Sequence, residues 1–117
     1  MKKSTERERQ WAFLKALSRL ILFAEQSGWM LTGGDLKSRP GNKPKHSKNS
    51  YHYRRRAVDL NLFFKVNGKW EYQTTTEAHK ELGTCWEALG GTWGGRFTNP
   101  DGNHYSWGEG KRRRLDE

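Results

Sequence analysis

The strongest constraint on the fold is the stretch from 57 to 66, where apolar and polar residues alternate. A period of two predicts a β-strand with one face in the core and Asp59 presented to a cleft on the other. Asn67-Gly68 follows at once and is typical of a type I′ hairpin turn that leads into a second strand at 69–72. The apolar face of the first strand comprises Val58, Leu60, Leu62 and Phe64.

The N-terminal segment predicts an amphipathic helix over 5–27. Thr5 and Glu8 have the spacing of a capping box, and Gly28 is placed to end the helix. Apolar residues recur between them at steps of three and four, which predicts one stripe packed on the core. That stripe comprises Trp11, Leu14, Leu17, Ile21 and Ala24.

A second helix is predicted after a similar capping box, Thr74 to Glu77, and would end at Gly90-Gly91. Here too the apolar residues have helical spacing. We expect His79 to lie on the polar side of this helix, as an ordinary polar group and not a metal ligand. The apolar positions are Ala78, Leu82, Cys85 or Trp86, and Leu89.

These elements predict a small α+β domain in which a short antiparallel sheet with a hairpin packs against two main helices. The chain of 117 residues has room for one domain, 1–117, whose last residues, 111–117, form a charged tail. Its hydrophobic content is 32%, so the core is small, and six Trp and five Phe supply much of its area. Shorter strands are predicted at 29–32 and 105–107, with loops at 35–49 and 92–103.

The net charge of +9 predicts attraction to a polyanion, either nucleic acid or an anionic bacterial envelope. No zinc-finger, RNA-sheet or helix-turn-helix pattern supports nucleic acid. The lone Cys85 excludes an internal disulfide and a cysteine-based zinc site, so we expect a core residue. No signal peptide or transmembrane segment is evident, because the apolar run 20–24 is too short. We therefore expect a chain made in the cytoplasm.

Two histidines and two aspartates form a candidate metal site: His52, Asp59, Asp101 and His104. Two imidazoles and one carboxylate suit Zn²⁺ and leave a fourth position for water, with the second carboxylate as a base. This set suggests a hydrolase. His52 and Asp59 are an odd number of positions apart, so the chain at 54–56 must bend if both bind one ion.

These residues resemble the zinc peptidases that include D-alanyl-D-alanine carboxypeptidases and phage endolysins cleaving the L-alanyl-D-glutamate bond. Ser50-x-His52, followed by Asp59 in an Ala-Val-Asp-Leu strand, is similar to the first motif of that family. Asp101-x-x-His104 after Trp93-Gly94-Gly95 is similar to the second. The resemblance covers most of 20–107.

The resemblance implies that His52, Asp59 and His104 bind one Zn²⁺ in a cleft on the sheet. It makes Asp101 the catalytic carboxylate and Arg39 the cation that holds substrate or stabilises the oxyanion.

Ser50 and Tyr105 would contact substrate or support the ligands. The family often has Gly where this chain has Arg56, and the run Arg54-Arg55-Arg56 has no counterpart in that pattern.

The implied function is hydrolysis of the peptide stem of peptidoglycan, at the L-Ala–D-Glu bond, by a phage or prophage endolysin. A monomer held in the host cytoplasm would then need a holin-type membrane partner to reach the cell wall. Three alternatives stay open: a D-alanyl-D-alanine carboxypeptidase or dipeptidase, a basic nucleic-acid-binding protein, and an inactive metal-binding relative. Asp101 argues against the last, because a structural site has no need of a base.

Overall fold

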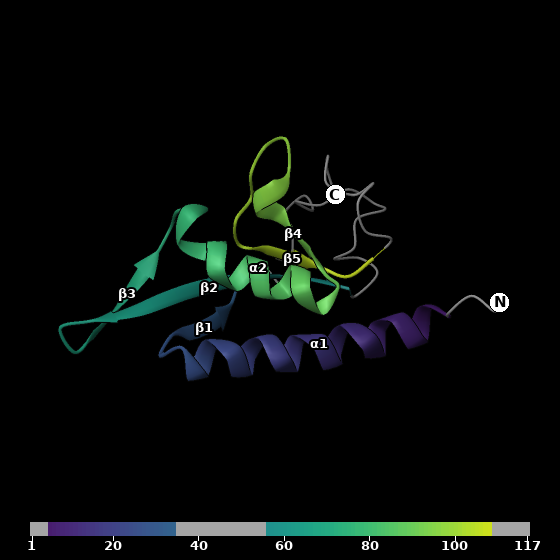
Figure 1. Cartoon of the computed structure of the whole chain (residues 1–117), viewed down its shortest axis with the longest axis horizontal. Coiled ribbons are helices and arrows are strands. Elements are labelled where there is room, and N and C mark those ends of the chain that lie inside the picture. Colours follow the sequence, from purple (N-terminus) through teal and green to yellow (C-terminus); the bar gives the residue numbers. More distant parts are fainter. Residues whose placement is uncertain (1–4, 35–55, 109–117) are drawn as a thin grey trace, which may run out of the picture.

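The structure, a computed structural model, describes residues 5–34 and 56–108 as two helices, two short 3₁₀ turns and a five-stranded antiparallel sheet (Figure 1). The order of elements is α1 (Glu6–Gln26), β1 (Met30–Gly33), β2 (Ala57–Val66), β3 (Lys69–Gln73), η1 (Glu77–His79), α2 (Lys80–Leu89), β4 (Thr92–Trp93), η2 (Gly94–Arg96) and β5 (His104–Ser106). Within these residues, no helix combines the length and apolarity that a bilayer span requires.

Strand β2 organises the sheet, because three strands pair with it. Phe63 of β2 pairs with Met30 of β1 and also with Tyr72 of β3, so β1 and β3 lie on opposite sides of β2. Strand β5 pairs with the first residues of β2, from Ala57 to Asp59, and β4 pairs with the outer edge of β5. The long central strand thus connects the hairpin to the segment that carries the second predicted motif.

Both helices contribute to a core on one face of the sheet. Alternation along β2 buries Val58, Leu60 and Leu62, as the sequence predicts, while Asp59 lies on the opposite face. The predicted α+β architecture is therefore confirmed, with a hairpin in an antiparallel sheet and two main helices. The buried cluster comprises Phe13, Ala16, Leu20, Ala24, Val58, Leu60, Leu82, Trp86, Trp93 and Tyr105.

Helix α1 has the predicted ends but buries a different face. Thr5 and Glu8 form the capping box, and Gly28 follows the helix with a φ of +84°. The predicted stripe was wrong in part: Trp11, Leu14 and Ile21 remain 60%, 54% and 49% exposed. The residues that are buried instead are Phe13, Ala16, Leu20 and Ala24.

The physical reason is that α1 is apolar over more than one stripe, so periodicity leaves two faces available for the core. The buried face carries two alanines, which allow the close approach of neighbouring backbones, and Phe13 meets Trp86 of α2 edge to face at 6.0 Å. Packing against α2 therefore selects this face.

The predicted turn signals have mixed outcomes. Asn67 and Gly68 both have positive φ, 51° and 80°, which confirms the type I′ hairpin. Gly90, with a φ of 111°, ends α2 as expected. The capping box from Thr74 to Glu77 was wrong, because a 3₁₀ turn precedes α2 and the Thr75 hydroxyl accepts the bond from the Ala78 N–H (3.1 Å).

Arg56 is a buried structural residue. Its side chain is fully buried, and its Nε lies 2.7 Å from a carboxylate oxygen of Glu6 at the start of α1. One terminal nitrogen also donates to the Trp107 carbonyl (2.9 Å). The guanidinium thus joins α1, β2 and the chain after β5, which accounts for one of the three consecutive arginines. Arg54 and Arg55 lie outside the described residues.

His79 is buried in η1 and does not lie on the polar side of a helix. Its Nδ1 is 2.8 Å from the Tyr105 hydroxyl, which joins η1 to β5. Burial lowers the pKa of His79 to about 4 and raises the pKa of the Tyr105 hydroxyl well above its ordinary range. The imidazole is therefore neutral at physiological pH.

We expect the stability of the fold to decrease as the pH falls from about 6.5 to about 4. In that interval the unfolded chain binds a proton at His79 that the folded chain excludes, a difference of about 3 kcal/mol across the window. Urea unfolding of metal-free protein at several pH values should show a shallower decrease for His79→Gln than for the wild type. Equal pH dependences in the two proteins would contradict this assignment.

Candidate active site

The pairing of β2 with β5 brings Asp59 and His104 together. They are direct partners in the antiparallel register. On either side of this pair, the Leu60 N–H donates to the Asn103 carbonyl and the Trp107 N–H donates to the Arg56 carbonyl, both at 2.8 Å. Asp59 and His104 thus form a non-hydrogen-bonded pair, where cross-strand side chains approach most closely.

The two side chains have a separation that suits a shared metal ion. Nδ1 of His104 lies 3.6 Å from Oδ1 of Asp59, and the side chains are only 6% and 14% exposed. Two donors of a tetrahedral zinc ion, each about 2.0–2.2 Å from it, lie roughly 3.4 Å apart. The ring of Phe97 packs beside His104, with centroids 5.4 Å apart, and limits its orientation.

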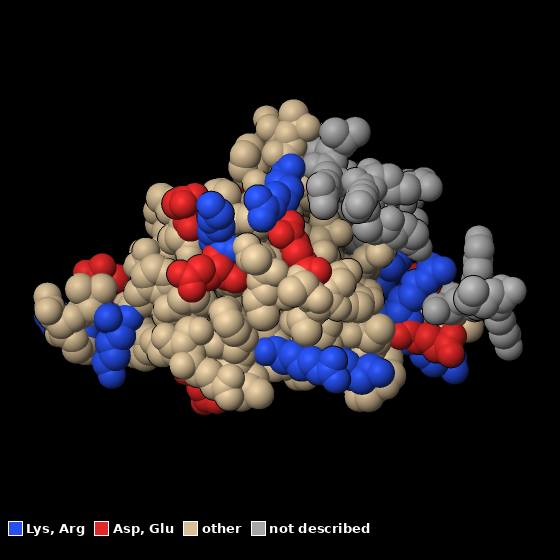
Figure 2. Space-filling view, viewed as in Figure 1, with Lys and Arg blue, Asp and Glu red and all other residues tan. Residues whose placement is uncertain are grey.

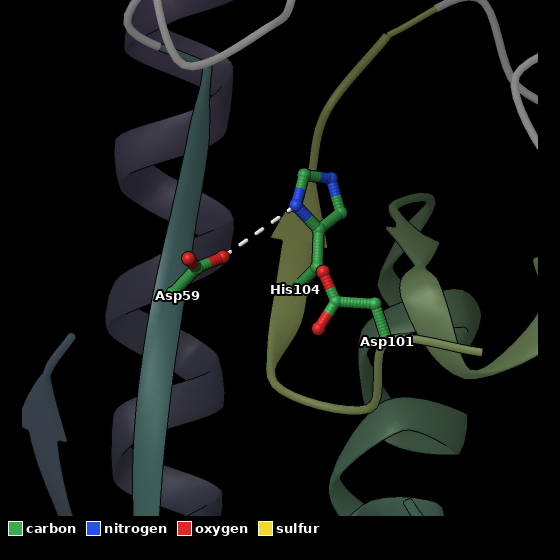
Figure 3. A group of neighbouring side chains, drawn as sticks. All are labelled: Asp59, Asp101 and His104. Atoms are coloured by element: carbon green, nitrogen blue, oxygen red, sulfur yellow. Dashed lines mark ion pairs between the residues drawn. The ribbon is translucent and has the colours of Figure 1, made fainter. Parts of the chain in front are cut away.

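Asp101 completes the group from the loop before β5. One donor atom from each of Asp59, Asp101 and His104 lies within 4.8 Å of the other two. Figure 3 shows Asp59 and His104 facing each other across the two strands, with the Asp101 carboxylate turned toward them. Asp101 is exposed to solvent, whereas Asp59 is partly buried and His104 is buried.

Backbone bonds hold the Asp101 loop in place. The Asp101 N–H donates to the Gly94 carbonyl (2.9 Å), and the His104 N–H donates to the Asp101 carbonyl (3.1 Å). The Trp93 indole N–H donates to the Gly102 carbonyl (2.7 Å). A Cβ at position 94 would lie 2.3 Å from the Asp101 carbonyl oxygen. The Trp93-Gly94 motif therefore supports the loop, and only glycine allows this approach.

A polar pocket of about 200 Å³ lies beside Asp101. Its walls are the end of β3 with the turn that follows, and the loop that carries Asp101. No sequence pattern predicts this pocket, because Thr74 at the start of the threonine run 74–76 has the spacing of a helix cap. These threonines are brought to Asp101 only by the turn between β3 and α2.

The predicted site residues have different outcomes. Asp59, Asp101 and His104 come together, as the two motifs require. Tyr105 does not fit the predicted substrate contact, because it is fully buried on the core face of β5 with its hydroxyl on His79. It points away from His104 because successive residues of a strand face opposite sides. His52, Ser50 and Arg39 lie outside the described residues.

The geometry agrees with comparison to known families. The profile described as D-alanyl-D-alanine carboxypeptidase matches residues 44–107, which include both motifs. The chain belongs to this zinc peptidase family. Among curated proteins, none matches the chain significantly. The family is one of zinc metallopeptidases, so the chain is related to hydrolases, as the ligand set suggested.

The donor set fits the zinc ion of the family. It offers an imidazole nitrogen and carboxylate oxygens, which are zinc ligands in hydrolytic sites. Asp59 and His104 would hold the ion, and Asp101 adds an exposed carboxylate to the group. When bound, zinc supplies a Lewis acid that polarises a carbonyl group and makes water more acidic.

Proposed function

We propose that the protein is a zinc peptidase that hydrolyses the peptide stem of bacterial peptidoglycan, at the bond between L-alanine and D-glutamate. The observation that carries the proposal is the convergence of Asp59, His104 and Asp101 within 4.8 Å in a chain of this family. A ligand pair beside an exposed carboxylate is what metal-assisted hydrolysis of an amide requires.

Each predicted residue has a role in this proposal. Asp59 and His104, with His52, hold one zinc ion. Asp101 accepts a proton from the attacking water and then passes it to the leaving amine. Arg39 stabilises the negative charge that develops on the carbonyl oxygen.

Ser50 supports the site next to His52. Tyr105 acts only from the core, where its bond to His79 supports the strand that carries His104.

The cellular setting we propose is lysis by a phage or prophage. The protein would accumulate in the host cytoplasm as a monomer and reach the wall through a holin-type partner. The net charge of +9 would favour the anionic wall. Figure 2 shows Lys and Arg interspersed with Asp and Glu on the visible face, and not the continuous basic stripe of a nucleic-acid interface.

The second candidate is a D-alanyl-D-alanine carboxypeptidase, which the description of the matching family favours. Both reactions use the same ligands and the same base, so they differ only in which part of the stem lies next to Asp101.

Digestion of purified muropeptides by the zinc-loaded protein, with products identified by mass spectrometry, separates the two reactions. Cleavage between L-alanine and D-glutamate is the expected result. Release of free D-alanine alone would establish the carboxypeptidase and overturn the endopeptidase. Intact muropeptides, with zinc bound in a folded protein, would refute both.

A further inference from the structure

A row of aromatic side chains lies on the same face of the sheet as the metal site. Along β2, Asp59 is followed on this face by Phe63 and then by Lys65, because every second residue of a strand points to the same side. Their direct partners on β3 are Tyr72 and Trp70. Cross-strand partners share a face, so the rings of Phe63, Tyr72 and Trp70 form one surface, the aromatic platform, between the metal site and the hairpin turn.

The aromatic platform is accessible to solvent. Tyr72 and Trp70 are 55% and 43% exposed, and Phe63 is half-buried. The hairpin that carries them extends past both helices (Figure 1). A single exposed aromatic residue needs no explanation, but neighbouring exposed rings on one strand pair form a contiguous apolar surface, which in soluble proteins marks a binding site.

Contacts within the sheet hold these rings in place and put polar groups beside them. The rings of Phe63 and Tyr72 pack with centroids 5.4 Å apart and an interplanar angle of 36°. The Tyr72 hydroxyl donates to the side-chain oxygen of Asn61 (3.3 Å). Nζ of Lys65 lies 5.3 Å from the centroid of the Trp70 ring. The platform therefore combines fixed ring faces with a hydroxyl, a carboxamide and an ammonium group at their edges.

This combination favours a sugar as the ligand. A pyranose ring has a face of C–H groups that packs on the negative π-face of an aromatic ring. Its hydroxyl and acetamido groups then point outward, where the side chains of Asn61 and Lys65 supply donors and an acceptor. An acyl chain or an apolar protein surface would cover the same rings but would offer these polar groups no hydrogen bonds, which makes their burial costly.

The position of the platform agrees with the proposed substrate. In a peptidoglycan stem, a lactyl group joins the L-alanine of the scissile bond to a sugar of the glycan strand, so this sugar begins about 7 Å from the scissile bond. At about 3.3 Å per residue along β2, Phe63 lies roughly 13 Å from Asp59, and the pair of Lys65 with Trp70 lies roughly 20 Å from it. The sugar and its neighbours in the glycan strand can therefore reach the platform.

We propose that the aromatic platform binds N-acetylated sugars of the glycan strand while the stem peptide occupies the metal site. The proposal rests on the proposed function, because that function places a glycan-linked alanine at the zinc ion. It predicts that the protein distinguishes a stem peptide attached to its glycan from the same peptide alone.

The first test compares a stem peptide linked to a short glycan with the same peptide alone, using the full zinc-loaded chain. In the wild type, kcat/KM should be higher for the glycan-linked substrate. Trp70→Ala should lower the ratio of the two kcat/KM values by at least about tenfold, mainly through a higher KM, because it removes an aromatic anchor. If alanine weakens the hairpin, as circular dichroism would show, Trp70→Thr removes the ring and keeps a residue that favours strands.

Trp11→Ala is the matched control for this change. Trp11 is also an exposed tryptophan, at 60%, with a lysine beside it, since Nζ of Lys15 lies 5.5 Å from its ring centroid. It belongs to α1, however, which packs on the opposite face of the sheet. This variant should keep the wild-type ratio. A ratio that stays at the wild-type value in folded Trp70→Ala or Trp70→Thr would overturn the proposal.

A binding measurement separates this proposal from the proposed function. Glycan strands from which the stem peptides have been removed are titrated by calorimetry into the zinc-loaded wild type, Trp70→Ala and Trp11→Ala. We expect Trp70→Ala to bind them at least about tenfold more weakly than the other two. If that difference is found but no stem peptide is cleaved between L-alanine and D-glutamate, the platform stands and the reaction is wrong.

Two other outcomes overturn the platform and leave the reaction in place. The first is cleavage of stem peptides by a protein that does not bind the glycan, or that binds it equally well as Trp70→Ala. The second is a dimer in sedimentation equilibrium that Trp70→Ala dissociates, again without glycan binding, which would assign these rings to a contact between two copies of the chain.

Discussion

Replacing Asp101 with alanine is expected to lower kcat/KM for stem-peptide hydrolysis by about 10²–10⁴-fold, the usual contribution of a general acid–base group, and to leave bound zinc unchanged. The reason is the division of roles in the site. Asp59 and His104 face each other at a ligand-like distance of 3.6 Å, whereas Asp101 is exposed and reaches the group from a separate loop. Zinc content per chain and the rate of muropeptide cleavage measure the two properties independently.

The loop should keep its shape in this variant, since Asp101 is bonded to Gly94 and His104 through its backbone. Asn99→Ala, an exposed change in the same loop, is the matched control and should retain normal activity. Cleavage at the wild-type rate by Asp101→Ala would show that another group is the base. Loss of zinc from this variant would instead make Asp101 a ligand.

Replacing Asp59 with alanine should remove both zinc and activity. The variant lacks one of the donors, and we expect zinc affinity to fall by at least about 100-fold, since even a residue that only supports a ligand contributes 10–100-fold. Dialysis against a metal buffer followed by elemental analysis would measure the affinity. Circular dichroism would check that the sheet is intact.

Asn61→Ala is the matched control for this change. Asn61 lies on the same face of β2, two residues further along, and its side chain bonds to Thr32 and Tyr72 and not to the site. This variant should bind zinc normally. If Asp59→Ala retained the metal with wild-type affinity, the ion would have to be held without β2, and the assignment of Asp59 would be wrong.

Much of the fold could be predicted because it depends on residues that are close in the chain. The capping box of Thr5 and Glu8, the turn at Asn67-Gly68 and the alternation along β2 each need only a few neighbouring residues, and the structure confirms all of them. The two motifs could be found for the same reason, since each spans only a few residues. Their meeting could be inferred only through the resemblance to a family.

The failures involve contacts between distant parts of the chain. The sequence predicts an apolar face for α1, but packing against α2 decides that Phe13 and Leu20 are buried while Trp11 is exposed. The sequence left the run Arg54-Arg55-Arg56 unexplained, and the structure shows that Arg56 is buried against Glu6, fifty positions earlier.

By itself, then, the sequence determined the elements, the hairpin and the residue types of the metal site, because propensity, periodicity and motif spacing are local properties. The tertiary structure alone decided that Asp59 and His104 are cross-strand partners and that Tyr105, one residue further, is in the core. It also placed the turn after β3 beside Asp101 to form the polar pocket. The physical reason is that strand register and side-chain burial depend on which surfaces pack together. Residues far apart in the chain form those surfaces jointly, so no local pattern determines the outcome.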